Sequence, residues 1–167
     1  MKRTLSRAAL ATAAVMLMGV ASGAEKKGKY EYVQVNRFDV QEGIDFPADY
    51  QLTMTEDLVK NLENSKLLKQ VMRQGETLPE GQPVLRIAGT VTKYKKGSQA
   101  ARYLVGFGAG ATVIEAQVKF YDAATNELLL DKKVDGKVWI GVMGGKSEGA
   151  NNGVAKEIIK TGKGKFF

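Results

Sequence analysis

The switch from a glycine cluster to a long two-residue alternation most constrains how this chain can fold. The glycines are Gly106, Gly108 and Gly110, and the alternation runs from Thr112 to Asp122. Its inward positions are Ile114, Ala116, Val118 and Phe120. Polar side chains occupy the positions between them, so the segment predicts a strand with one buried and one solvated face.

Two neighbouring segments follow the same period. Val84–Lys95 and Glu127–Ile140 each alternate apolar with polar residues, which predicts two further strands. Their expected inward residues are Leu85, Ile87, Val91, Leu128, Leu130, Val134 and Val138. Between the last two strands, Asp122 can accept bonds from backbone N–H groups two or three positions on, and Asn126 tolerates positive φ. The sequence therefore predicts a hairpin at this turn.

The first half of the chain and its end predict two helices and two more strands. Tyr32–Val40 is the expected first strand, and Lys66–Arg73 contains a short one before the loop Gln74–Pro83. Ala48–Leu62 has helical spacing through Leu52, Met54, Leu58, Val59 and Leu62, with Asp45 where an N-cap would lie. A closing helix is expected over Ala150–Thr161, with Val154 and Ile158 on one face.

This order of elements indicates the α+β class. We expect a mainly antiparallel sheet of about five strands, with two helices packed on one face. The length suits one such domain over residues 31–167, after a flexible lead-in over residues 25–30.

The first 24 residues are typical of a secretory signal peptide. Lys2, Arg3 and Arg7 precede an apolar run from Ala8 to Val20, and small residues end at Ala24. The run is shorter than the roughly 20 residues of a spanning helix, although an uncleaved anchor is the alternative. We therefore expect an exported protein of the periplasm or the outer-membrane periphery.

The amino-acid composition argues against several classes of enzyme. The chain has no His and no Cys, so it lacks the commonest general base, the thiol nucleophile and the usual zinc ligands. We expect no enzyme activity, no catalytic residue, no cofactor and no metal. Removal of residues 1–24 lowers the net charge from +7 to +4, and export makes nucleic acid an unexpected partner.

The segment GFGAGA matches the letters of a dinucleotide fingerprint but not its context. That motif requires its last glycine to open a helix, whereas the β-branched residues after Gly110 predict a strand. Glycines also let two backbones approach closely. We therefore interpret the segment as a strand crossing and predict a partner contact at Gly106, Phe107, Gly108 and Gly110.

Two other classes of function stay open. Lys93, Lys95, Lys96 and Arg102, with Tyr94 and Tyr103 between them, would suit a module that binds an anionic lipid or glycan surface. The uncharged stretch Tyr103–Ile114 would suit an oligomeric outer-membrane pore component.

The stretch AARYLVGFGAGATVIEAQVKFYDAATNELLL resembles a family of bacterial exported proteins known as domain of unknown function 4410. The matching positions are Lys96, Gly97, Ser98, Arg102, Gly106, Gly108, Ala109, Gly110, Asp122, Thr125 and Leu128. Gly144–Ile158 is similar to the segment of small residues that leads into the family's last helix. Asn126 departs from a commoner glycine, and the lipobox cysteine of many members is missing.

The resemblance implies a fold and an envelope location, and no activity. Together with the composition, it predicts a non-enzymatic exported envelope protein that serves in protein interaction or assembly. The expected partner is another envelope protein, and the oligomeric state stays open.

Overall fold

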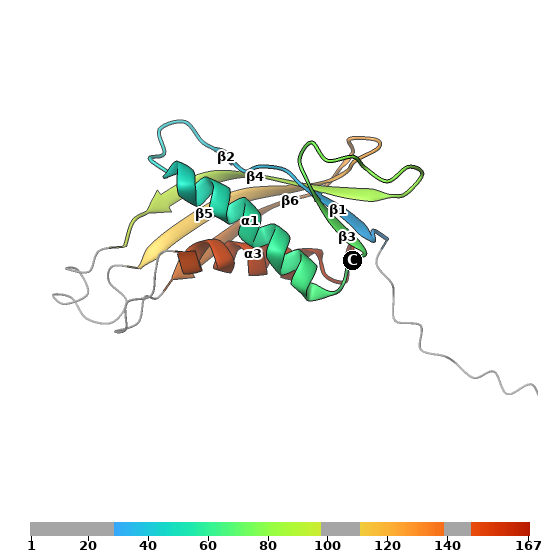
Figure 1. Cartoon of the computed structure of the whole chain (residues 1–167). Helices are drawn as coiled ribbons and strands as arrows, with labels where there is room; N and C mark the ends of the chain where they lie inside the picture. The colour runs from blue at the N-terminus through green and yellow to red at the C-terminus, as the bar shows by residue number, and fades with distance from the viewer. Residues whose placement is uncertain (1–28, 98–110, 139–147) are drawn as a thin grey trace, which may run out of the picture.

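A mixed sheet and two helices make up the described part of the chain (Figure 1). The structure, a computed structural model, describes residues 29–97, 111–138 and 148–167. The strands are β1 (Tyr32–Val35), β2 (Asp39–Val40), β3 (Gln70–Arg73), β4 (Val84–Lys95), β5 (Thr112–Asp122) and β6 (Leu128–Val138). The helices are α1 (Ala48–Ser65) and α3 (Glu148–Gly162).

The sheet has six strands in the order β3-β1-β4-β5-β6, with β2 also beside β4. β4, β5 and β6 are antiparallel, whereas β1 pairs in parallel with both β3 and β4, and β2 pairs in parallel with β4. The α+β class is confirmed. The mainly antiparallel sheet of about five strands is corrected to a mixed sheet of six.

The extra strand arises because the expected strand Tyr32–Val40 is broken at residues 36–38. Phe38 is fully buried at this break, and its ring occupies the space beside Gly89 of β4. A Cβ atom at Gly89 would lie 2.1 Å from Phe38 Cε1, so only glycine leaves room for the ring. β1 and β2 therefore pair with β4 as two short, separate strands.

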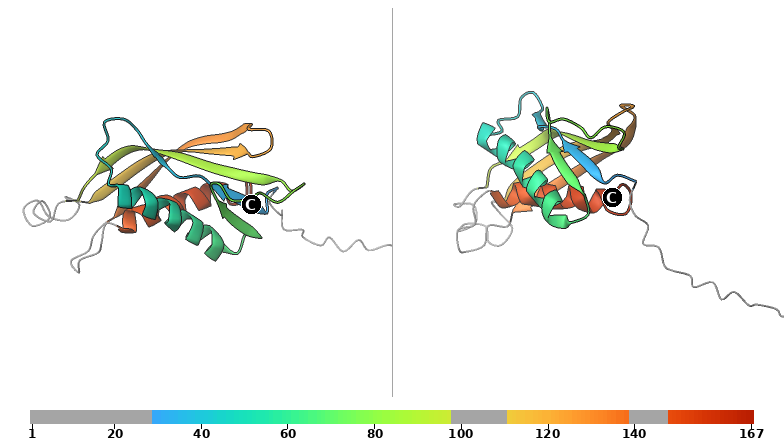
Figure 2. Two further views of the ribbon diagram at one scale, coloured as in Figure 1. Left: turned by 45° about the horizontal axis from the view of Figure 1, so that its top comes forward. Right: turned by 45° about the vertical axis from the view of Figure 1, so that its right-hand side comes forward.

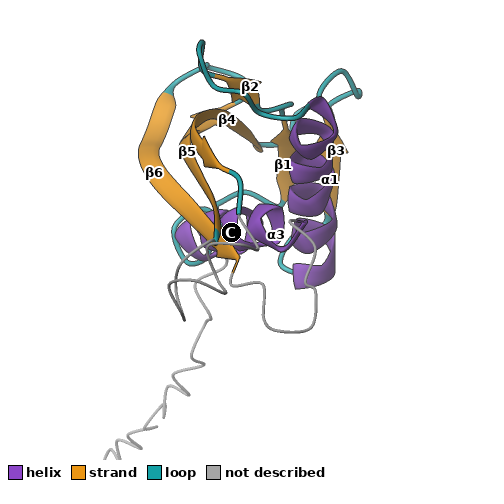
Figure 3. Cartoon of the chain, turned by 90° about the vertical axis from the view of Figure 1, so that its left-hand side faces the viewer, coloured by secondary structure: helices purple, strands orange, loops and turns teal. Residues whose placement is uncertain are grey.

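Both helices cover the same face of the sheet (Figure 2). α1 contacts α3, β3 and β1, while α3 contacts β6 and β5. Viewed end-on, the sheet curves around the helices, with β6 at one edge and β3 at the other (Figure 3).

The core lies between the sheet and the helices, where strand alternation predicts it. Every inward residue expected in β4 and β5 is fully buried, and so are Val154 and Ile158 of α3. From α1, the core receives Met54, Leu58, Val59 and Leu62. The two-residue and 3.6-residue periods were sufficient to identify these positions.

Three expected positions are wrong. Leu52 is 58% exposed in the first turns of α1. Leu128 is 49% exposed, because a register shift between Phe120 and Tyr121 breaks the alternation where β6 begins. Asp45 caps no helix: α1 begins after Pro47 and has no side-chain cap.

The two ends of the domain meet. Tyr30 lies in the expected lead-in, yet its side chain is buried and its N–H donates to the Phe166 carbonyl at 2.8 Å. Phe166 stacks on Phe120 with ring centroids 5.2 Å apart, and Phe167 is buried against Gly162. The packed domain therefore includes Tyr30, before the expected boundary at residue 31.

Candidate functional site

The predicted partner-contact residues Gly106, Phe107, Gly108 and Gly110 lie outside the described residues, and so does Arg102. The flanks of their segment are described. Lys95 near the end of β4 lies opposite Val113 near the start of β5, and the Gly97 N–H donates to Thr112 Oγ1 at 3.1 Å. The segment thus leaves and re-enters the sheet at one end.

Lys93 belongs to an ion-pair cluster on the outer face of this sheet end. Glu115 of β5 lies between Lys93 of β4, at 2.8 Å, and Lys133 of β6, at 2.6 Å. Hydrogen bonds from Lys133 and then Lys93 lower the pKa of Glu115 to about 2. Because Glu115 offsets its charge, Lys93 contributes less to an anion-binding surface than sequence reasoning assigned to it.

Lys95 and Lys96 remain exposed at the same sheet end. Within the described ranges neither makes an ion pair. Tyr94 points to the opposite face, where its ring meets Phe46 at 5.1 Å and Tyr50 at 6.2 Å, and burial raises its pKa. Lys95 and Tyr94 therefore lie on opposite faces, as neighbours in a strand do, whereas Lys96 lies beyond the end of β4.

Sequence reasoning missed Lys133, which completes the Glu115 cluster. Its two-residue spacing from Asp131 and Asp135 marks all three as outward positions of β6. The cross-strand neighbour of a residue depends on the strand register. A slip of two residues keeps each side chain on its face, so the alternating pattern does not specify that neighbour.

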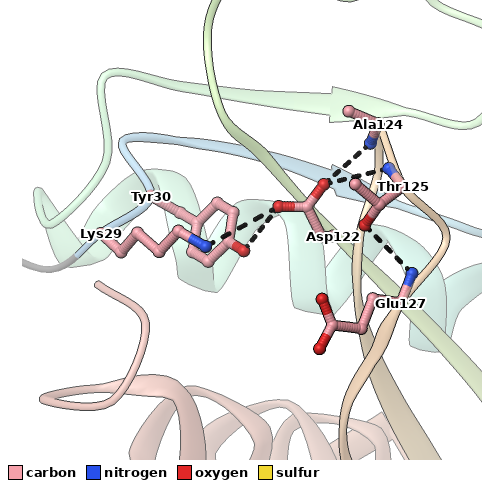
Figure 4. A network of polar contacts seen from close by, with 6 residues as sticks. All are labelled: Lys29, Tyr30, Asp122, Ala124, Thr125 and Glu127. Carbon is pink, nitrogen blue, oxygen red and sulfur yellow. Dashed lines mark hydrogen bonds and ion pairs between the residues drawn. The ribbon is translucent and has the colours of Figure 1, made fainter.

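A second polar network lies at the opposite end of β5 (Figure 4). Tyr30 donates its hydroxyl to Asp122 Oδ2 at 2.9 Å, and Lys29 lies 3.9 Å from that oxygen. Asp122 Oδ1 accepts from the N–H groups of Ala124 at 3.0 Å and Thr125 at 3.2 Å. The bond from Tyr30, followed by that from Thr125, lowers the pKa of Asp122.

This network is structural in character. Both Asp122 oxygens already accept hydrogen bonds from the domain itself, so the carboxylate is committed to holding the turn and the chain start. Asn126 adopts φ 59°, the left-handed conformation expected of it in this hairpin. The predicted hairpin and its bonding pattern are confirmed.

Residues 29–97, 111–138 and 148–167 contain neither a metal-binding cluster nor a membrane-spanning helix. No group of three His, Cys, Asp or Glu side chains in these ranges is placed to hold a metal ion. No described helix combines the length and apolar character required to cross a bilayer.

Strand β6 is a long edge of the sheet. Within the described part of the chain this eleven-residue strand pairs with β5 alone, through ten residue pairs. Three of its charged side chains bind groups of neighbouring elements. Asp131 accepts from Gln117, Lys133 binds Glu115, and Lys132 binds Glu157 at 3.7 Å and Thr161 at 3.0 Å.

Two solved structures with a similar fold come from bacteria. The PelC dodecamer from Paraburkholderia phytofirmans matches with a TM-score of 0.58 and 9% identity, covering 79% of this chain and 88% of that one. Protein XCC0632 from Xanthomonas campestris matches with a TM-score of 0.56 and 12% identity, covering 81% and 85%. At such identities the likeness concerns the fold alone.

Sequence comparison identifies the family. Comparison with curated proteins finds no match. The family described as domain of unknown function DUF4410 matches residues 41–141, which include β4, β5, β6 and the glycine segment. This chain belongs to the DUF4410 family.

Proposed function

We propose that this protein is a non-enzymatic protein of the cell envelope that assembles with protein partners, including further copies of itself, through the edge of β6. The observation that carries the proposal is the length of this edge. Ten of the eleven residues of β6 pair with β5 on one side, and the described residues place no strand on the other.

An unpaired strand edge presents backbone N–H and C=O groups that another strand can bind. Eleven residues extend for roughly 35 Å, and about half of their backbone groups point away from β5. A partner strand would satisfy these groups without rearranging the sheet.

Soluble proteins commonly protect such edges with charged side chains. Here Asp131, Lys132 and Lys133 bind groups on β5 and α3, so their side chains are directed toward their own domain. Leu128, 49% exposed at the start of the strand, adds apolar surface to the same edge. These features favour a specific contact.

The fold likeness to PelC supports the inclusion of further copies, because that protein forms a dodecamer. Our chain has two unlike sheet edges, β3 and β6. Pairing of unlike edges is head-to-tail, and such contacts generate closed rings when the rotation between copies allows it.

Cysteine cross-linking tests the proposal cleanly because the chain has no cysteine of its own. We expect the double variant Gln70→Cys/Lys133→Cys, with one thiol on each sheet edge, to give dimers and higher species when the mature protein is treated with a short bis-maleimide. Gln70→Cys/Glu80→Cys, with its second thiol in the exposed loop before β4, is the matched control and should stay monomeric. Equal cross-linking of both variants, or monomer from both, would refute assembly through β6.

Export and the absence of catalysis rest on the sequence. Residues 1–24 have the three parts of a signal peptide, and the chain lacks His and Cys. Mass spectrometry of a tagged protein from the periplasmic fraction should give a mature chain that begins at Glu25. Recovery of the full-length chain from the inner membrane would contradict this.

Exposed Lys95 and Lys96 favour a second candidate, the binding of an anionic lipid or glycan surface by the sheet end next to the glycine segment. Sedimentation with anionic vesicles over a salt series separates the two functions. Binding through these lysines should weaken as salt rises, whereas pairing at β6 should persist.

A further inference from the structure

A groove of about 520 Å³ lies between the C-terminal parts of α1 and α3. Asn61, Asn64 and Ser65 line it from α1. The opposite wall consists of Lys156, Ile159, Lys160 and Lys163. The groove is shallow and open to solvent, so a ligand bound in it would stay partly exposed.

The lysines form one stripe because their spacing follows the helical repeat. Lys156 and Lys160 are four residues apart in α3, and Lys163 follows three later in the turn after the helix, so all three line the same wall of the groove. Like charges at this spacing destabilise a helix by a few tenths of a kcal/mol per pair. The arrangement therefore has a small cost unless an anion offsets it.

The surrounding negative groups do not cancel the stripe. Lys160 lies 3.6 Å from Glu157, which is shared with Lys132 at 3.7 Å. Lys156 and Lys163 make no ion pair within the described residues, and none of the residues that line the groove is acidic. Each nearby helix C-terminus contributes about half a negative charge. Glu157 and both helix ends together leave the groove positive.

The other wall supplies neutral polar groups. Asn61 Nδ2 donates to the Asp57 carbonyl at 2.7 Å, which leaves Asn61 Oδ1 and one N–H for a ligand, and the Asn64 amide can both donate and accept; such groups suit hydroxyls. Ile159 provides an apolar contact between the two walls. Lysines on one side and amides on the other match a ligand that carries acidic groups among hydroxyls.

We propose that the groove between α1 and α3 binds an acidic saccharide, with Lys156 and Lys163 holding its carboxylate groups and Asn61 and Asn64 its hydroxyls. This site is separate from the β6 edge, since none of its lining residues belongs to that strand. Saccharide binding in the groove and assembly through β6 can therefore be tested separately.

Calorimetric titration of the mature protein with trigalacturonate tests this at low salt. We expect saturable one-site binding that the double variant Lys156→Gln/Lys163→Gln weakens about tenfold or more, because each lysine supplies a charge-assisted bond. The variant Lys95→Gln/Lys96→Gln removes the same charge at the far sheet end and should bind as the wild type does. Neutral maltotriose should not bind.

A second variant tests the amide wall. Asn64→Leu keeps the charge of the groove and should weaken binding of trigalacturonate several-fold. Thermal unfolding of every variant establishes that it is folded, as expected for exposed positions.

Three outcomes would overturn the proposal. Equal loss in both lysine pairs would indicate attraction to overall charge. Loss of binding confined to Lys95→Gln/Lys96→Gln would indicate that the saccharide binds at the sheet end instead. Binding to phosphatidylglycerol vesicles without binding to trigalacturonate would indicate a lipid surface instead of a saccharide.

Discussion

Glu115 links three strands of the sheet, because its carboxylate forms ion pairs with lysines of β4 and β6. Lys133 and Lys93 bind its carboxylate from two neighbouring strands and lower its pKa to about 2 from an ordinary value of 4.5. In the unfolded chain these lysines are dispersed, so the carboxylate regains its ordinary affinity for a proton. The folded state therefore favours ionised Glu115.

This difference predicts how stability depends on pH. A lowered pKa in the folded state gives stability that is complete above about pH 4.5 and is lost as the pH falls toward 2. We expect the melting temperature to decrease over this interval, and Glu115→Gln to make the decrease shallower. Thermal unfolding at closely spaced pH values measures both.

Glu80→Gln, in the exposed loop before β4, is the control for loss of one carboxylate and should leave the slope unchanged. The account of the cluster is wrong if Glu115→Gln and wild type lose stability in parallel.

The β5–β6 hairpin shows at the scale of an element how one side chain organises a turn and joins it to the rest of the domain. Asp122 holds the N–H groups of Ala124 and Thr125 with one oxygen and the hydroxyl of Tyr30 with the other. The turn and the start of the domain are thus coupled through a single carboxylate.

We expect Asp122→Ala to lower the free energy of unfolding by about 1–3 kcal/mol, because it leaves the buried Tyr30 hydroxyl unpaired and frees two turn amides. Urea denaturation measures the loss. In a double-mutant cycle, Tyr30→Phe should cost less in the Asp122→Ala background than in the wild type. Strict additivity would show that the two groups do not interact.

At the scale of the whole molecule, the C-terminal aromatic residues close the core. Phe166 stacks on Phe120, its carbonyl accepts from the Tyr30 N–H, and Phe167 packs on Gly162. A Cβ at Gly162 would lie 2.4 Å from the Phe167 ring, so the glycine makes room for it. These contacts join both ends of the domain to the sheet and α3.

Phe167→Ala should therefore destabilise the domain by about 3 kcal/mol, as expected for truncation of a buried aromatic side chain. Leu52→Ala removes an apolar side chain that is 58% exposed and should change stability by no more than about 0.5 kcal/mol. Calorimetric unfolding of the two variants compares them directly. Similar stabilities would indicate that the chain end packs loosely.

The candidate sites differ in how far the sequence predicts them. The exposed position of Lys95 follows from strand alternation, which also places Tyr94 on the other face, whereas Lys96 lies beyond the end of β4. The ion pairs of Lys93 depend on strand order, and so does the edge of β6 that pairs with no described strand. The groove lined by Lys156 and Lys163 depends on which helix packs beside α3, and helical spacing does not specify that helix.

The sequence by itself determined the local structure of this protein. Two-residue alternation predicts β4 and β5 with their observed ends, and the side-chain chemistry of Asp122 and Asn126 predicts the hairpin, because these features depend only on near neighbours. Family membership also follows from sequence.

Only the tertiary structure decided the parallel pairing of β1 with β3 and β4, the break at Phe38, and the exposure of Leu128. A strand's alternation is the same in either direction, so direction and partner are set by how the chain returns through α1. Contacts between residues far apart in the chain decide these features, and a local pattern does not encode them.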